Sequence, residues 1–89
     1  MMKIKQGFVM RKVGDSFVAA PVGEESARTR AMIVLNETGA WLWNFFSADH
    51  TEEECAIALA EEYEIDVETA KRDAHAFLQA FRNRGMLEE

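Results

Sequence analysis

The chain has 89 residues and a formal net charge of −6, and 48% of its residues are hydrophobic. This length suits one domain spanning residues 1–89, and the apolar content excludes a disordered chain. No run approaches the roughly 18–20 apolar residues that a membrane span needs. We expect a cytoplasmic protein, and the lone Cys55, which cannot form an internal disulfide, fits a reducing compartment.

The charges are unevenly distributed along the chain. Residues 1–35 hold six Lys or Arg and three acids, whereas residues 49–68 hold nine acids and no Lys or Arg. Nucleic-acid affinity depends on neutralising phosphates with basic side chains, so this acidic middle argues against a nucleic-acid partner.

The first third of the sequence is typical of β-strands. "GFVMRKV" (7–13) and "FVAAPV" (17–22) are β-prone runs joined by the turn-like "GDS", which predicts a hairpin. A third short strand, "AMIVL" (31–35), follows the polar stretch "GEESARTR". We expect this strand to pair with the hairpin.

Helical periodicity begins after Asn36, which can cap a helix over residues 37–47. The buried stripe of this helix is predicted to consist of Trp41, Leu42, Phe45 and Phe46. Each helical residue is rotated by about 100° from the one before it, so Trp43 points away from the face that Trp41 and Leu42 share, and we expect it to be partly exposed.

Two further helices are predicted. Thr51 and Glu54 have the capping-box spacing at the start of a helix over 52–63. Asp66 can cap a third helix over 67–84, whose apolar stripe comprises Val67, Ala70, Ala74, Phe77, Leu78 and Phe81, and Gly85 stands at the expected C′ position. The predicted fold is α+β, with three N-terminal antiparallel strands followed by three helices. The last two helices would form a helix-turn-helix, which makes the domain winged-helix-like.

Catalytic motifs are missing from the sequence. His50, Cys55 and His75 fit no metal-ligand spacing, and there is no phosphate-binding Gly-rich loop or nucleophile elbow. We therefore predict no catalytic residue, no metal and no cofactor, and a protein that is not an enzyme.

The third predicted helix offers two faces besides its apolar stripe. One carries Arg72, His75, Gln79 and Arg82, which would be the recognition face of a winged-helix DNA-binding regulator. The other carries Thr69, Asp73, Ala76, Ala80 and Arg84, whose small residues leave room for a peptide. Such a peptide could add to an unpaired edge of the third strand. A homodimer that pairs through strand edges is a further alternative.

Three segments together resemble a known family. The third strand with its junction, "MIVLNETGAWLW" (32–43), the capped helix that begins at Thr51, and "DAHAFLQAFRNRGML" (73–87) are similar to coenzyme PQQ synthesis protein D. Members of this family are small domains also called RiPP recognition elements. The resemblance covers nearly the whole chain.

The resemblance implies a peptide chaperone without a cofactor. It would bind the leader of a ribosomally made precursor peptide and present the precursor to a modifying enzyme, often a radical SAM protein. The leader would add to the edge of the third strand, against the third helix. Carried over to this sequence, the strand residues are Ala31, Met32, Ile33 and Val34, the helix residues are Asp73, Ala76, Phe77 and Ala80, and the flanking contacts are Arg30 and Arg84.

Two segments depart from the family pattern. Many members have an Asp-Gly turn where this chain has "SADH", and the approach to the third strand is the basic "ARTR". We therefore leave the precursor peptide unspecified.

Overall fold

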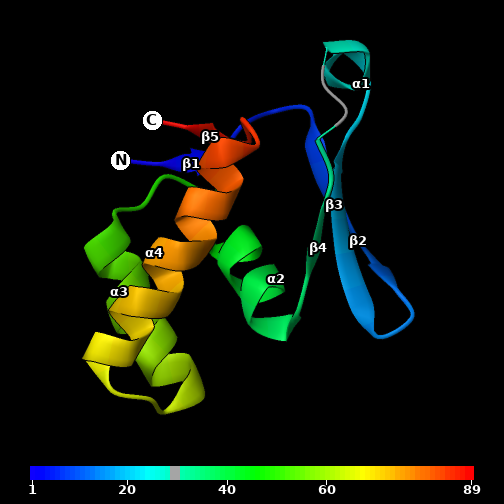
Figure 1. Cartoon of the computed structure of the whole chain (residues 1–89). Coiled ribbons are helices and arrows are strands. Elements are labelled where there is room, and N and C mark those ends of the chain that lie inside the picture. Colours follow the sequence, from blue (N-terminus) through cyan, green and yellow to red (C-terminus); the bar gives the residue numbers. More distant parts are fainter. Residues whose placement is uncertain (29–30) are drawn as a thin grey trace.

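The computed structural model describes residues 1–28 and 31–89. In chain order the elements are β1 (Lys3–Ile4), β2 (Phe8–Val13), β3 (Ser16–Pro21), α1 (Glu24–Arg28), β4 (Ile33–Leu35), α2 (Glu37–Phe45), α3 (Glu52–Tyr63), α4 (Val67–Asn83) and β5 (Leu87–Glu88) (Figure 1). The predicted α+β class is confirmed.

An antiparallel sheet with the order β2-β3-β4 forms one side of the molecule. The predicted hairpin is confirmed, and its connection is only Gly14 and Asp15, since Val13 pairs with Ser16. Gly14 has a φ of 63°, a conformation that glycine adopts readily in tight hairpin turns. The third strand is shorter than predicted and begins at Ile33.

Alternation along the strands gives the sheet an inner face. Phe8, Ala19, Ile33 and Leu35 are buried in the main core, whereas Val34 between them is exposed. Helices α2, α3 and α4 lie together on one side of the hairpin (Figure 1).

Helix α2 is the central element of the core, and one prediction about it is wrong. Trp43 is buried, with its ring edge-on to Phe81 of α4 at 5.5 Å, whereas Trp41 is only partly buried and stacks on Phe45 at 5.3 Å. The prediction assumed one buried stripe, but α2 is packed on more than one side, against the sheet and against α4. The helix also ends at Phe45, two residues before the predicted end.

Helices α3 and α4 form an antiparallel pair beside α2 (Figure 1). The predicted capping box of Thr51 and Glu54 and the predicted cap Asp66 are both confirmed. Gly85, with a φ of 69°, follows the α4 cap as predicted, and Val67 departs from the predicted stripe because this first helical residue is 43% exposed. No helix of residues 1–28 or 31–89 is both long and apolar enough to cross a membrane.

The structure adds a helix and two strands to the predicted elements. With helix α1, residues 1–28 and 31–89 contain four helices rather than the predicted three. Helix α1 was not predicted because its five residues bury no side chain and so show no apolar period. Strands β1 and β5 pair antiparallel and join the two ends of the chain, but each has only two residues.

Candidate functional site

Strand β4 is an edge strand. It pairs with β3 on one side, and no other strand of the described residues pairs with its second side. Met32, just before the strand, is 59% exposed and Val34 is 64% exposed, while Ile33 points into the core. An open edge of this kind can accept a further strand from another chain.

The junction between β4 and α2 brings α4 close to this edge. The Asn36 side chain accepts a hydrogen bond from the Gly39 amide at 2.9 Å, which fixes the first turn of α2 directly after β4. A Cβ atom at Gly39 would lie 2.7 Å from Cε1 of Phe77 and 3.0 Å from Cδ2 of Leu35. The ring of Phe77 in α4 therefore lies against the backbone of this junction.

The face of α4 around Phe77 combines small and polar residues. Asp73 and Ala80 are half-buried and lie about one turn to either side of Phe77. Asp73 forms no ion pair with the described residues. At the end of the helix, the Arg84 guanidinium donates to the Ala80 carbonyl at 3.3 Å. We call Met32, Ile33, Val34, Asp73, Phe77, Ala80 and Arg84 together the β4–α4 site.

Three of the predicted site residues are not part of the β4–α4 site. Arg30 is outside the described residues, and Ala31 is half-buried against the core just before β4. Ala76 is exposed and lines a hollow on another side of α4. It therefore borders the β4–α4 site rather than lying within it.

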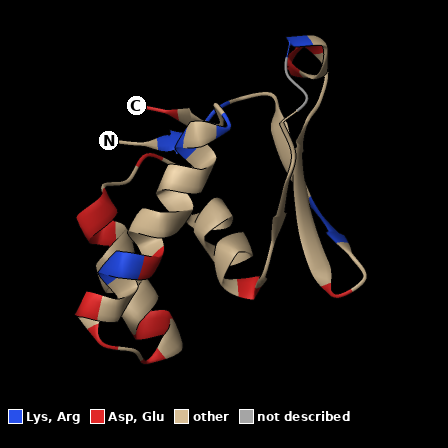
Figure 2. Ribbon diagram, in the orientation of Figure 1, with Lys and Arg blue, Asp and Glu red and all other residues tan. Residues whose placement is uncertain are grey.

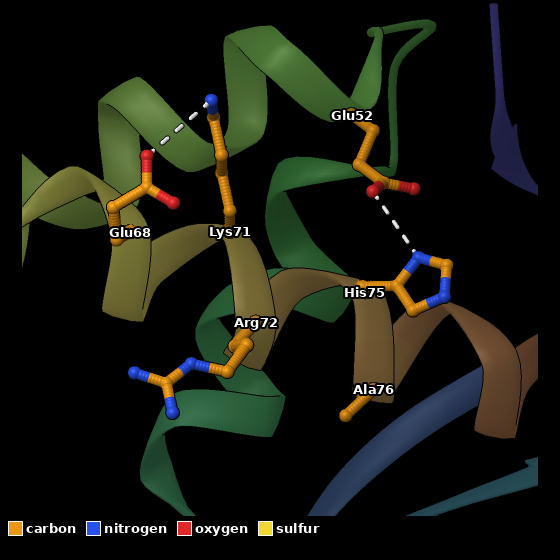
Figure 3. Close-up of a pocket in the computed structure, with 6 residues that line it drawn as sticks. All are labelled: Glu52, Glu68, Lys71, Arg72, His75 and Ala76. Atoms are coloured by element: carbon orange, nitrogen blue, oxygen red, sulfur yellow. Dashed lines mark hydrogen bonds and ion pairs between the residues drawn. The ribbon is translucent and has the colours of Figure 1, made fainter.

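That hollow of about 430 Å³ lies between α3 and α4, and most of the residues that line it have ionisable side chains (Figure 3). It is lined by Glu52, Glu68, Lys71, Arg72, His75 and Ala76. His75 Nδ1 lies 3.2 Å from Glu52 Oε2, and Lys71 Nζ lies 3.8 Å from Glu68 Oε1. Figure 3 shows Arg72 extending away from both pairs.

Further polar side chains along α4 contact one another in sequence, from His75 to Glu89. Gln79 lies between His75, at 3.4 Å, and Arg82, at 3.2 Å. Arg82 then donates two hydrogen bonds to Glu89, at 2.9 and 3.0 Å, which lower the pKa of that carboxyl. His75 and Arg82, two basic members of the predicted DNA-recognition face, thus contact carboxylates of this chain and the Gln79 side-chain amide, which reduces their capacity to bind phosphates.

Cys55 offers little nucleophilic chemistry. It is fully buried, and burial raises the pKa of its thiol to about 12, so the reactive thiolate is disfavoured at neutral pH. Within residues 1–28 and 31–89, no three His, Cys, Asp or Glu side chains are grouped so that they could hold a metal ion.

Two residues at the junction were not among the predicted site residues. Gly39 lies against both Phe77 and Leu35, which only the three-dimensional structure shows. A glycine within the first turn of a helical pattern was the available signal, because such a residue usually has a packing reason.

The fold and the edge strand define a small α+β domain that matches a known family. Residues 25–87 match the family model of coenzyme PQQ synthesis protein D (PqqD). The match covers well over half of the chain, and the protein belongs to the PqqD family. No curated protein matches the sequence.

Two solved structures share the fold. TbiB1 in complex with the TbiA(beta) leader peptide is 27% identical, with a TM-score of 0.74 over 97% of this chain and 94% of that one. Lasso peptide synthetase B1 complexed with the leader peptide is 20% identical, with a TM-score of 0.74 over 99% of this chain and 98% of that one. At 20% identity the second likeness concerns the fold alone.

Proposed function

We propose that this chain is a single, non-catalytic peptide-recognition domain that binds the leader of a ribosomally made precursor peptide. In this proposal it acts in the cytoplasm and presents the precursor to a modifying enzyme, of which a radical SAM protein is our leading candidate. Membership of the PqqD family supports this function. The observation that carries it is the match over nearly the whole chain to TbiB1, which was solved with a leader peptide bound.

We propose the β4–α4 site as the place where the leader binds. The leader would extend the sheet as a strand beside β4, so main-chain hydrogen bonds would supply affinity that depends little on sequence. Its side chains would contact Phe77 and Ala80, while Asp73 and Arg84 would select charged groups. Ala31 and Ala76 would border the bound peptide, and Arg30 is kept as a flanking contact.

A winged-helix DNA-binding regulator is the alternative function. Helices α3 and α4 would be its helix-turn-helix and the β2–β3 hairpin its wing. The carboxylates of Glu52 and Glu89 beside α4, together with the acids of α3 (Figure 2), weaken this alternative because they would repel phosphates. A homodimer paired through the β4 edge is a further alternative, and it would compete with the leader.

An amide NMR titration tests the proposal directly. The labelled protein is titrated with a synthetic leader from the precursor gene nearest to this gene. We expect shifts at residues 31–35 and 73–84 that depend weakly on salt. Shifts confined to 71–82 that appear with duplex DNA and vanish at high salt would instead identify the regulator.

A substitution on α4 tests the location of the leader. Ala76→Glu places bulk and charge at the border of the β4–α4 site, so leader affinity should fall by about tenfold or more, as expected when charge is desolvated without a partner. The melting temperature should change little because Ala76 is exposed. Isothermal titration and thermal unfolding measure the two effects.

Gln79→Glu is the matched control for this substitution. It introduces the same charge one helical turn along α4 and about 60° further round the helix, away from the β4–α4 site, where Gln79 is also exposed. Equal losses of affinity in both variants would indicate general repulsion of an acidic leader and would argue against this site.

A further inference from the structure

The outer face of the three-stranded sheet is apolar although it faces solvent. Val9 is 39% exposed, Val13 is 59% exposed and Val34 is 64% exposed. In a sheet that is covered on one side, outward positions are ordinarily polar. Exposed apolar side chains that are contiguous, rather than scattered, mark interaction surfaces.

The strand register makes these residues contiguous. Val9 pairs with Ala20, Arg11 with Val18, and Val18 in turn with Val34, so the apolar side chains cross all three strands. A hollow of about 300 Å³ opens on this face, lined by Val9, Arg11, Val13, Val18, Ala20 and Val22. We call these six residues and Val34 the outer sheet face.

Arg11 is the charged member of the outer sheet face. No carboxylate of the described residues pairs with it. An apolar partner that covered this face would bury the guanidinium beside valines, which is costly unless the partner supplies an acceptor. The partner must therefore combine apolar side chains with a carboxylate.

A second copy of this chain, docked through its own outer sheet face, would not supply the carboxylate that Arg11 requires. An isologous contact would bring two outer sheet faces together, and neither carries an acid that could pair with Arg11 of the other. Two buried guanidinium groups would remain without partners, and their like charges would oppose association.

We propose that the outer sheet face docks the modifying enzyme, through an apolar surface of that enzyme that carries a carboxylate opposite Arg11. This inference rests on the proposed function, which supplies the enzyme as the partner. Val34 belongs to both surfaces, because the leader would pair with the main chain of β4 while the Val34 side chain lies on the outer sheet face. Arg11, however, lies on β2, whereas the leader would add to β4 at the other edge of the sheet. The domain could thus hold the leader and the enzyme at the same time.

Charge reversal at two neighbouring residues tests the docking surface. Arg11 and Lys12 are adjacent and exposed, but strand alternation directs them to opposite faces of the sheet. The probe is the purified enzyme encoded beside the precursor gene, and its affinity is measured by biolayer interferometry. Arg11→Glu should weaken enzyme binding by about tenfold or more. Lys12→Glu should change it by less than about threefold, as is usual for exposed charges.

A second pair of variants tests the apolar part. Val9→Thr combined with Val13→Thr keeps the side-chain shape and adds hydroxyl groups to the outer sheet face, so enzyme binding should weaken. Val67→Thr makes the same change on α4 and should leave enzyme binding unaltered. Thermal unfolding shows whether each variant remains folded.

Leader affinity, measured on the same variants, separates the two proposals. Docking is supported if Arg11→Glu loses the enzyme but keeps the leader. It is overturned if Arg11→Glu and Lys12→Glu behave alike, if the enzyme does not bind, or if sedimentation shows a dimer that the valine substitutions dissociate. Failure of the wild-type protein to bind any leader would instead refute the proposed function.

Discussion

At the scale of a single residue, Asn36 contributes to stability as the N-cap of α2. Its side chain caps α2 through the Gly39 amide, and it lies between the edge strand and the first core helix. Because Asn36 is exposed, its contribution comes from the cap rather than from burial. A substitution of Asn36 should therefore change the stability of the fold without changing the affinity for a leader peptide.

Asn36→Ala should lower the free energy of unfolding by about 1 kcal/mol, the usual loss for a helix N-cap. Leader affinity should stay within about twofold of wild type, a change of roughly 0.4 kcal/mol. Urea denaturation and isothermal titration measure the two quantities. A variant of unchanged stability that no longer binds leader would assign Asn36 to the binding site instead.

Gly39 is constrained by the ring that lies against it. Gly39→Ala would gain roughly 1 kcal/mol of helix propensity. The added methyl, however, would meet Phe77 Cε1 at 2.7 Å and Leu35 Cδ2 at 3.0 Å, so at least one of these side chains must move. We expect a net loss of about 1–3 kcal/mol, the typical cost of overpacking.

A double-mutant cycle provides the control for Gly39→Ala. In a Phe77→Leu background the ring carbon is absent, so the alanine should cost less than in the wild type. Chemical denaturation of all four proteins gives the coupling energy. An equal cost in both backgrounds would show that the ring is not what excludes a side chain at residue 39.

At the scale of elements, the starts of α3 and α4 are both fixed by carboxylates. Glu54 accepts a hydrogen bond from the Thr51 amide at 2.8 Å, which lowers the pKa of the Glu54 carboxyl. Hydrogen bonds donated by the side chain and amide of Thr69 likewise lower the pKa of Asp66. Both carboxyls are therefore more acidic in the folded chain than in the unfolded chain.

These shifts predict a loss of stability in acid. A carboxyl whose folded pKa is lowered contributes stability above its unfolded pKa, about 3.9 for Asp and 4.3 for Glu, and this stability is lost as pH falls through the folded value. Asp66→Asn retains a good cap that does not titrate in this range. Urea denaturation from about pH 5 to about pH 3 should therefore show a smaller decline for the variant than for the wild type. Identical declines would show that the Asp66 cap does not contribute.

The same elements show what the sequence could predict. The hairpin, the edge strand, three helices and all three caps follow from strong local signals, namely β-prone runs, apolar periods and cap spacing. The burial of Trp43 could not be predicted in this way, because it depends on α4 covering a second side of α2. Helix α1 and the β1–β5 pair carry too few residues for a periodic signal.

At the scale of the whole molecule, the candidate site was predictable in part. Its strand and helix residues follow from the family resemblance, whereas Leu35 and Gly39 emerge only from the packing of α4 on the junction. The separation of charge was visible in the sequence, and Figure 2 shows acids along α3 and its connection to α4, with basic residues on β2. The outer sheet face required the register, because residues from three strands make it contiguous.

The short β1–β5 ladder has a practical consequence for protein engineering. Lys3 lies opposite Glu88 in the register, so the first and last residues emerge side by side (Figure 1). Chains whose ends meet tolerate insertion into a host loop and circular permutation. This domain could therefore be inserted into a surface loop of an unrelated protein through two short linkers without disrupting the fold of either protein.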